Sequence, residues 1–203
     1  TPVNNDIEQN NDKDNPQIIY GQSIDGLGGP DAFGYKWIDS DEPNGPAYIW
    51  DDITSTGTQV TNWLASSTYD PKDEGYAGPF QLGFNFKFYG NIKTQIYIGS
   101  NGVILFSPIN QSYFTNASIP NTALPNEYIA PFWDDLDGRT QGTVHYKQDG
   151  SRFIVQFTNW QKFSASGSLT FQVVLHSSGK ILVYYNNMLS LIHISEPTRL
   201  RRI

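Results

Sequence analysis

The strongest constraint on the fold is an alternation of apolar and polar residues along several segments that follow residue 79. In the first of these segments the apolar positions are Leu82, Phe84, Phe86 and Phe88. The same spacing of two recurs over residues 153–157, 169–175 and 181–185. Because successive side chains of a strand point to opposite faces of a sheet, this spacing predicts half-buried β-strands.

The connections between these segments are short, and they determine how the predicted strands pair. Ser177-Ser178-Gly179 is a compact turn between two of them, and no segment has the periodicity of a long helix. Strands joined by tight turns pair antiparallel, since a parallel pair needs a long crossover. The sequence therefore predicts an all-β fold, an antiparallel two-sheet β-sandwich of about ten to twelve strands with little or no helix.

Shorter elements are also expected from local patterns. Short strands are predicted at Tyr35–Ile38, at Ala47–Trp50 and around Gln59–Leu64, and one helical turn near Ser112–Asn116. Asn101-Gly102 is a dipeptide in which both residues tolerate positive φ, so it predicts a hairpin turn.

The chain divides into three regions by composition. Residues 1–17 are rich in Asn and Asp and are predicted to be a linker or the end of a preceding region. Residues 18–188 form the predicted domain, in which 18–79 are an N-terminal lead-in. Leu189–Arg199 (LSLIHISEPTR) resembles the conceptual translation of a sequencing adapter, so residues 189–203 are predicted to be a non-native tail. A genuine C-terminal strand followed by a basic tail is the alternative.

The net charge and the absence of cysteine exclude several classes of function. A formal net charge of −7 argues against a nucleic-acid partner, because phosphate contacts require clustered Lys and Arg. With no cysteine, the chain has no disulfide, no thiol nucleophile and no Cys-ligated zinc. No apolar run approaches the roughly 18 residues that span a bilayer, so no membrane span is expected.

A family resemblance covers the second half of the chain, from Phe80 to Met188. The segments that carry it are Phe88-Tyr89-Gly90, the strand pair at Ile98–Phe106, IAPFWDD at Ile129–Asp135, GTVHY at Gly142–Tyr146, Phe153–Trp160 and the Phe171–Tyr185 hairpin. In this order they resemble the extracellular nidogen-like module and its bacterial relatives.

The resemblance implies a non-enzymatic extracellular module of a larger bacterial surface or secreted protein, with a role in adhesion, spacing or substrate targeting. The implied localisation is extracellular or at the cell surface. The implied partners are an extracellular protein or glycan and other domains of the same polypeptide.

Two acidic clusters are candidate metal sites. Asp134, Asp135 and Asp137 place three carboxylates within four positions, where their repulsion must be offset by water, a cation or hydrogen bonds. Asp39, Asp41 and Glu42 form a second acidic turn. The metal hypothesis for both clusters is an oxygen-lined Ca²⁺ site. For the first cluster the alternative is capping of backbone N–H groups at the strand end. No cofactor is expected to be required.

Catalytic candidates are few, and the chain is predicted not to be an enzyme. His145 and His176 lie in predicted strands and face away from the neighbouring apolar positions, which predicts solvent-facing side chains. Neither an H-E-x-x-H nor a G-x-S-x-G motif occurs. The enzymatic alternative is a glycosidase that uses Asp134 or Asp135, since glycoside hydrolysis needs two carboxyl groups about 5–10 Å apart.

Aromatic residues suggest one further ligand class. Trp37, Trp160 and Tyr113 are candidates for an exposed surface on which sugar rings stack. Such a surface is typical of a carbohydrate-binding module attached to a secreted hydrolase, which is the alternative function. Most aromatic side chains are nevertheless expected in the core, because the chain is 14% aromatic and only 16% charged.

Overall fold

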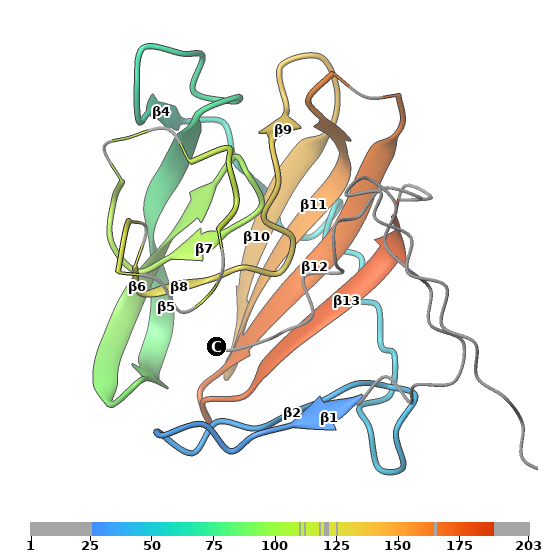
Figure 1. Ribbon diagram of the computed structural model, residues 1–203. Helices are drawn as coiled ribbons and strands as arrows, with labels where there is room; N and C mark the ends of the chain where they lie inside the picture. Colours follow the sequence, from blue (N-terminus) through green and yellow to red (C-terminus); the bar gives the residue numbers. More distant parts are fainter. Residues whose placement is uncertain are drawn as a thin grey trace, which may run out of the picture.

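The computed structural model describes residues 26–109, 111, 113–117, 119, 122–124, 126–164 and 166–188. Thirteen β-strands lie in this part of the chain, in three antiparallel sheets, and no helix occurs there. The two larger sheets face each other, one coloured green and the other orange in Figure 1. The prediction of an all-β, antiparallel β-sandwich is therefore confirmed.

The larger of the two facing sheets has the strand order β13-β12-β11-β10-β3, with β9 also paired to β11. Its strands are β3 (Thr58–Gln59), β9 (Leu136–Asp137), β10 (Thr143–Asp149), β11 (Arg152–Lys162), β12 (Ser168–His176) and β13 (Ile181–Asn187). The second sheet has the order β4-β5-β6-β7-β8. Its strands are β4 (Trp63–Ala65), β5 (Gly75–Phe88), β6 (Asn91–Gly99), β7 (Ile104–Leu105) and β8 (Tyr128–Ile129). A separate pair, β1 (Leu27–Gly28) and β2 (Trp37–Ile38), completes the fold.

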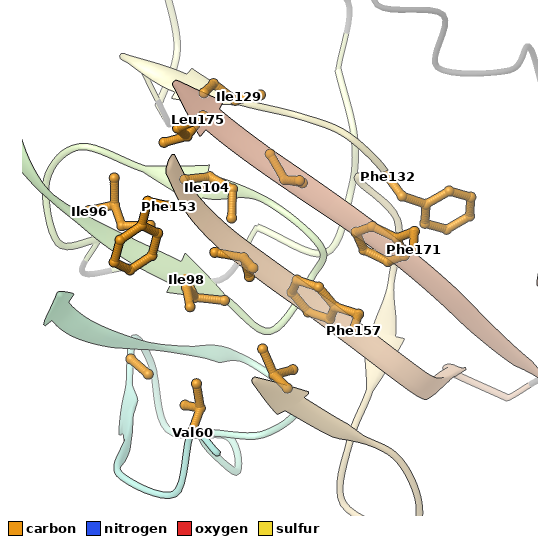
Figure 2. Close-up of a cluster of buried hydrophobic side chains, with 14 of the residues drawn as sticks. Val60, Ile96, Ile98, Ile104, Ile129, Phe132, Phe153, Phe157, Phe171 and Leu175 are labelled. Atoms are coloured by element: carbon orange, nitrogen blue, oxygen red, sulfur yellow. The ribbon is translucent and has the colours of Figure 1, made fainter. Parts of the chain in front are cut away.

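The main core fills the space between the two large sheets. Figure 2 shows Ile96 and Ile98 of β6 beside Phe153 and Phe157 of β11. Phe157 stacks on Phe171 of β12 with ring centroids 4.6 Å apart. Full burial of each such side chain contributes about 1.5–3 kcal/mol, so the interlocking rings and branched side chains are the main source of stability.

The outer face of the larger sheet is covered as well. Ile53 and Trp50 pack there against Ile154, Val174 and Tyr184. The segment that connects β2 to β3 is fastened to this face by polar contacts: Ile53 N donates to Gln156 Oε1 at 3.0 Å, and Gln172 Nε2 donates to Asp51 O at 2.8 Å. Consecutive residues of β11 and β12 are therefore buried, so both faces of these two strands are covered. The alternation in the sequence predicted strands buried on one face only.

Several local expectations differ from the structure. Ala47–Trp50 forms no strand, because it belongs to the covering segment, in which Trp50 packs on the outer face of the larger sheet. The single strand expected around Gln59–Leu64 is two short strands, β3 and β4, which belong to opposite sheets. Residues 113–116, the described part of the expected helical turn, form no helix. Strands of only two residues, such as β7 and β9, carry too little periodicity to be found in the sequence.

The predicted linker at residues 1–17 and the predicted tail at 189–203 lie outside the described residues. Nowhere in the described part of the chain does the structure contain a helix that could cross a membrane.

Candidate functional site

Three segments that are distant in the sequence meet at one end of the sandwich. They are residues 70–75 at the start of β5, the turn 99–102 between β6 and β7, and residues 132–139 around β9. The Ser100 hydroxyl donates to Asp73 O at 2.6 Å and accepts from Gly75 N at 2.9 Å. Gly138 N donates to Lys72 O at 3.0 Å. Backbone groups of all three segments are thus tied together through short hydrogen bonds.

The first segment is a turn organised by Asp70. Its side-chain Oδ1 accepts from Lys72 N at 2.8 Å, and its backbone carbonyl accepts from Asp73 N and Glu74 N at 3.0 and 2.8 Å. Aspartate often forms such turns, because its short side chain can bond to the backbone two residues further on. The turn brings the Asp73 and Glu74 side chains to the beginning of β5.

The second segment is the expected turn at Asn101-Gly102. Gly102 has a φ of +74° and its N–H donates to Gly99 O at 3.2 Å, so the turn itself is confirmed. A side chain at this glycine would overlap the Phe132 carbonyl. Asn101, however, does not adopt positive φ, and its side chain is fully buried. It serves a second purpose that the turn pattern does not predict.

The buried Asn101 amide joins the other two segments. Its Nδ2 donates to both carboxylate oxygens of Glu74 at 3.2 and 3.1 Å, and its Oδ1 accepts from Leu136 N at 2.8 Å. Glu74 Oε2 also lies 3.4 Å from Tyr113 N. The orientation of the Glu74 carboxylate is therefore set by three N–H contacts from two different segments.

These contacts produce a compact group of three carboxylates. Asp73, Glu74 and Asp135 each place one carboxylate oxygen within 4.8 Å of the oxygens of the other two. Asp73 and Glu74 are buried, and Asp135 is half-buried. Burial, together with the charges of Asp135 and Asp73, raises the pKa of Glu74 to about 7 against the opposing effect of the Asn101 and Tyr113 hydrogen bonds. Burial, followed by the charges of the neighbouring acids, also raises the pKa of both Asp73 and Asp135.

Asp73 is the least satisfied member of the group. Its Oδ2 lies 3.4 Å from the Arg139 guanidinium, while its Oδ1 is buried and has no hydrogen-bond partner among the described residues. Buried polar atoms are nearly always paired in folded proteins, because an unpaired buried oxygen loses its hydration without compensation. Asp73 Oδ1 therefore marks a position where a further group is expected.

The structure separates the three acids of the predicted 134–137 cluster. Only Asp135 among them joins the carboxylate group found in the described part of the chain. Asp134 Oδ2 accepts from Lys162 Nζ at 2.6 Å, and Asp137 receives a two-pronged contact from Arg139 at 2.9 and 2.8 Å. The Arg139 hydrogen bonds hold the pKa of Asp137 below its usual value, against the opposing effect of burial.

The second predicted acidic turn is used for backbone contacts. Asp39 Oδ1 accepts from Asp41 N at 3.0 Å, and Glu42 Oε1 accepts from Gly26 N at 3.1 Å. Across the residues that the structure describes, Asp39, Asp41 and Glu42 do not form a carboxylate group of metal-binding size. The side chains of Asp39 and Glu42 instead accept hydrogen bonds from backbone N–H groups.

Two of the three aromatic candidates are buried and donate hydrogen bonds to the backbone of the site segments. Trp160 is buried and its Nε1 donates to Ser100 O at 2.9 Å, and the buried Tyr113 hydroxyl donates to Gly75 O at 2.6 Å. Neither ring offers a face to a sugar in this structure, which corrects the expectation for both. Trp37 is half-buried, and its indole packs against Gly28 of the neighbouring strand.

The two histidines differ from their expected exposure. His145 is buried and His176 is half-buried, because the segment before β3 covers the outer face on which His145 lies. Burial lowers the pKa of each histidine. His145 Nδ1 and His176 Nε2 have no hydrogen-bond partner among the described residues.

A comparison with protein families decides the classification. A family model described as "NIDO related" matches residues 46–197. The chain belongs to the NIDO-related family. The matched range of this NIDO-related chain includes β3 to β13 and the three site segments, so the nidogen-like resemblance is confirmed. The match ends inside the segment 189–199, whose non-native origin remains a prediction.

Comparison with curated proteins gives a relative of much greater length. Alpha-tectorin from mouse (Mus musculus) is 32% identical to the NIDO-related chain over 84 residues. These residues are 41% of this chain but only 4% of alpha-tectorin. No solved structure gives a significant match.

Sequence reasoning missed Asp73, Glu74 and the buried role of Asn101. Asp73 and Glu74 stand in a polar segment, DPKDEG, whose charges look like an ordinary solvated turn. The one available signal is the position of two adjacent acids immediately before the glycine that begins a strand. Their proximity to Asp135 depends on the pairing of β5 with β6 and on the turn after β6, which no local pattern reports.

Proposed function

We propose that the chain is a non-enzymatic extracellular module of a larger protein, which contacts other proteins or neighbouring domains of its own polypeptide. The observation that carries this proposal is the NIDO-related match, which extends over both facing sheets. The similarity to alpha-tectorin, a much longer protein, supports a modular context. The bacterial setting expected from the sequence stays a prediction.

The geometry of the acidic residues supports the non-enzymatic part of the proposal. A glycosidase needs two carboxyl groups on either side of a sugar, about 5–10 Å apart and open to substrate. Asp134 is engaged by Lys162, and the carboxyl groups nearest to Asp135 are the buried Asp73 and Glu74. Because Asp73 and Glu74 are buried, neither of them is open to a sugar bound at Asp135.

The lead-in region is the proposed contact surface. Several of its large apolar side chains are exposed: Leu27, Phe33, Ile38, Tyr48 and Ile49. Leu27 and Ile38 are cross-strand partners in β1 and β2, so their side chains lie on the same face of that pair. Clusters of exposed apolar side chains are typical of protein-contact sites.

Binding by the purified full chain to extracellular matrix extracts and to a glycan array tests the proposal. We expect retention on the matrix that is lost after protease treatment, no retention on glycans, and no hydrolysis of ester, peptide or glycoside substrates. The double substitution Phe33→Ser and Ile49→Ser is expected to abolish retention. Leu124→Ser is the matched control, because Leu124 is as exposed as Ile49 and lies between β7 and β8, outside the lead-in.

Retention on defined glycans with no effect of protease treatment would favour the carbohydrate-binding alternative. Hydrolysis that Asp135→Asn abolishes without a change in melting temperature would refute the non-enzymatic assignment.

A further inference from the structure

The acidic group at the start of β5 has an excess of negative charge. Five carboxylates face one another there: Asp73, Glu74, Asp134, Asp135 and Asp137. Two cations oppose them. Arg139 forms a close ion pair with Asp137 at 2.8 Å and a longer one with Asp73 at 3.4 Å. Lys162 forms an ion pair with Asp134 at 2.6 Å. The residual negative charge lies on Asp73, Glu74 and Asp135, whose carboxylates are close together and of which two are buried.

The spacing of these three carboxylates fits one bound ion. Ca²⁺ binds oxygen ligands at about 2.3–2.6 Å, so two ligands on opposite sides of the ion are about 4.6–5.2 Å apart. The oxygens of Asp73, Glu74 and Asp135 lie within 4.8 Å of one another, which places them inside that limit. One ion can therefore touch all three without rearrangement of the backbone.

Unused hydrogen-bond acceptor sites on these side chains are a second observation. Asp73 Oδ1 is buried without a partner among the described residues, and only 9% of the Asp73 side chain is exposed. A carboxylate has about four lone-pair sites, of which Glu74 uses three for the Asn101 amide and Tyr113 N–H. The unpaired Asp73 oxygen is an observation independent of the acidity of the cluster, since a solvated acidic turn would leave it in water.

We propose that Asp73, Glu74 and Asp135 bind a Ca²⁺ ion that ties the start of β5 to the segment before β9. This ligand set shares only Asp135 with the one predicted from the sequence. Asn101 acts as a positioning residue, because its amide orients Glu74 and holds Leu136, the residue that follows Asp135. The proposal does not depend on the proposed function.

The chemistry of the donors selects the ion. All three donors are carboxylate oxygens, which suit hard cations and not the softer metals that prefer histidine or cysteine. Mg²⁺ demands near-ideal octahedral geometry and keeps several of its waters, whereas Ca²⁺ accepts irregular sets of six to eight oxygens. Because Asp73 and Glu74 are almost fully buried, a cation with fewer retained waters fits better.

The test is metal binding by the full chain, after treatment with EDTA and removal of the chelator. We expect a higher melting temperature with 1 mM Ca²⁺ than with EDTA, by an amount that grows with the logarithm of the ratio of ion concentration to Kd. Tb³⁺, a luminescent substitute for Ca²⁺, is expected to bind with emission excited through Tyr113, whose buried hydroxyl donates to the backbone of Gly75, the residue after Glu74. Excess Ca²⁺ should displace it.

Substitutions distinguish the proposed ligands from their neighbours. Asp135→Asn is expected to weaken Ca²⁺ binding at least tenfold, and it is a safe variant because Asp135 is only half-buried. Asp73→Asn is the second variant and should act in the same direction. Asp134→Asn and the remote, exposed Asp41→Asn are the controls, with Kd values within about twofold of the parent chain.

Three results would overturn the proposal. The first is no response of either melting temperature or Tb³⁺ emission to the ions. The second is unchanged Ca²⁺ affinity in Asp135→Asn, and the third is an equal response to Mg²⁺ at the same concentration. If Asp73→Asn fails to fold, Asp135→Asn alone decides between these outcomes.

Discussion

Replacement of Asn101 by alanine tests the argument that this buried amide, and not the turn alone, holds the site together. The side chain is fully buried and serves two segments at once, Glu74 on one side and Leu136 N on the other. Alanine keeps the turn, because the positive φ is carried by Gly102. The substitution therefore removes the bridge and leaves the backbone geometry in place.

The expected loss follows from the groups left without partners. An unsatisfied buried donor or acceptor reduces stability by about 1–3 kcal/mol, and more where the group is charged. Leu136 N and the Glu74 carboxylate both lose their Asn101 contacts, so we expect Asn101→Ala to lower the free energy of unfolding by about 3 kcal/mol. With a urea m-value of about 2 kcal/mol/M, the midpoint of unfolding falls by about 1.5 M.

The assay is equilibrium unfolding in urea, followed by tryptophan fluorescence, in buffer that contains EDTA so that bound cations do not contribute. Asn85→Ala is the matched control, because Asn85 is exposed on β5, and its effect is expected to stay within about 0.5 kcal/mol. A loss below about 1 kcal/mol in Asn101→Ala would show that the site does not depend on the amide bridge.

Three further predictions concern the covering segment and the backbone. Ile53→Ala should lower the free energy of unfolding by about 2–4 kcal/mol in the same urea assay, since Ile53 is fully buried between the lead-in and the outer face of the larger sheet. Gly102→Ala should cost at least about 2 kcal/mol, because it adds a side chain at positive φ against the Phe132 carbonyl, and a wild-type urea midpoint would contradict this. Burial lowers the pKa of His145, so its native form resists protonation, and the resulting loss of stability begins as the pH falls below the unfolded value of about 6.5. Between pH 7.5 and 5.5 the melting temperature of His145→Gln should therefore fall less than that of the parent chain, and parallel curves would contradict the assignment.

The core was predictable because its pattern is local. The alternation from Leu82 to Phe88 and from Leu169 to Leu175 reports the inward face of each strand without any knowledge of its partner. The cover on the outer face was not predictable, since it depends on Ile53 reaching a strand about a hundred residues further along the chain, where Ile53 N bonds to Gln156. A strand covered on both faces looks half-buried in the sequence whenever its outer residues are polar, as Gln156 and Gln172 are.

The candidate site illustrates the same limit at the scale of single side chains. The local sequence identified Asp135 through its acidic neighbours and Asn101 through its turn-forming dipeptide. It did not predict that both residues lie beside Glu74. Asp134 and Asp137 find cations in Lys162 and Arg139, so the crowding of charge that made the cluster conspicuous is resolved for two of its members. The carboxylate of Asp135 lies beside that of Glu74 instead. These two residues are far apart in the sequence and come together only when the sheets assemble. An acidic run therefore indicates where carboxylates accumulate, whereas a cation site requires carboxylate oxygens, such as Asp73 Oδ1, that the fold leaves without a partner.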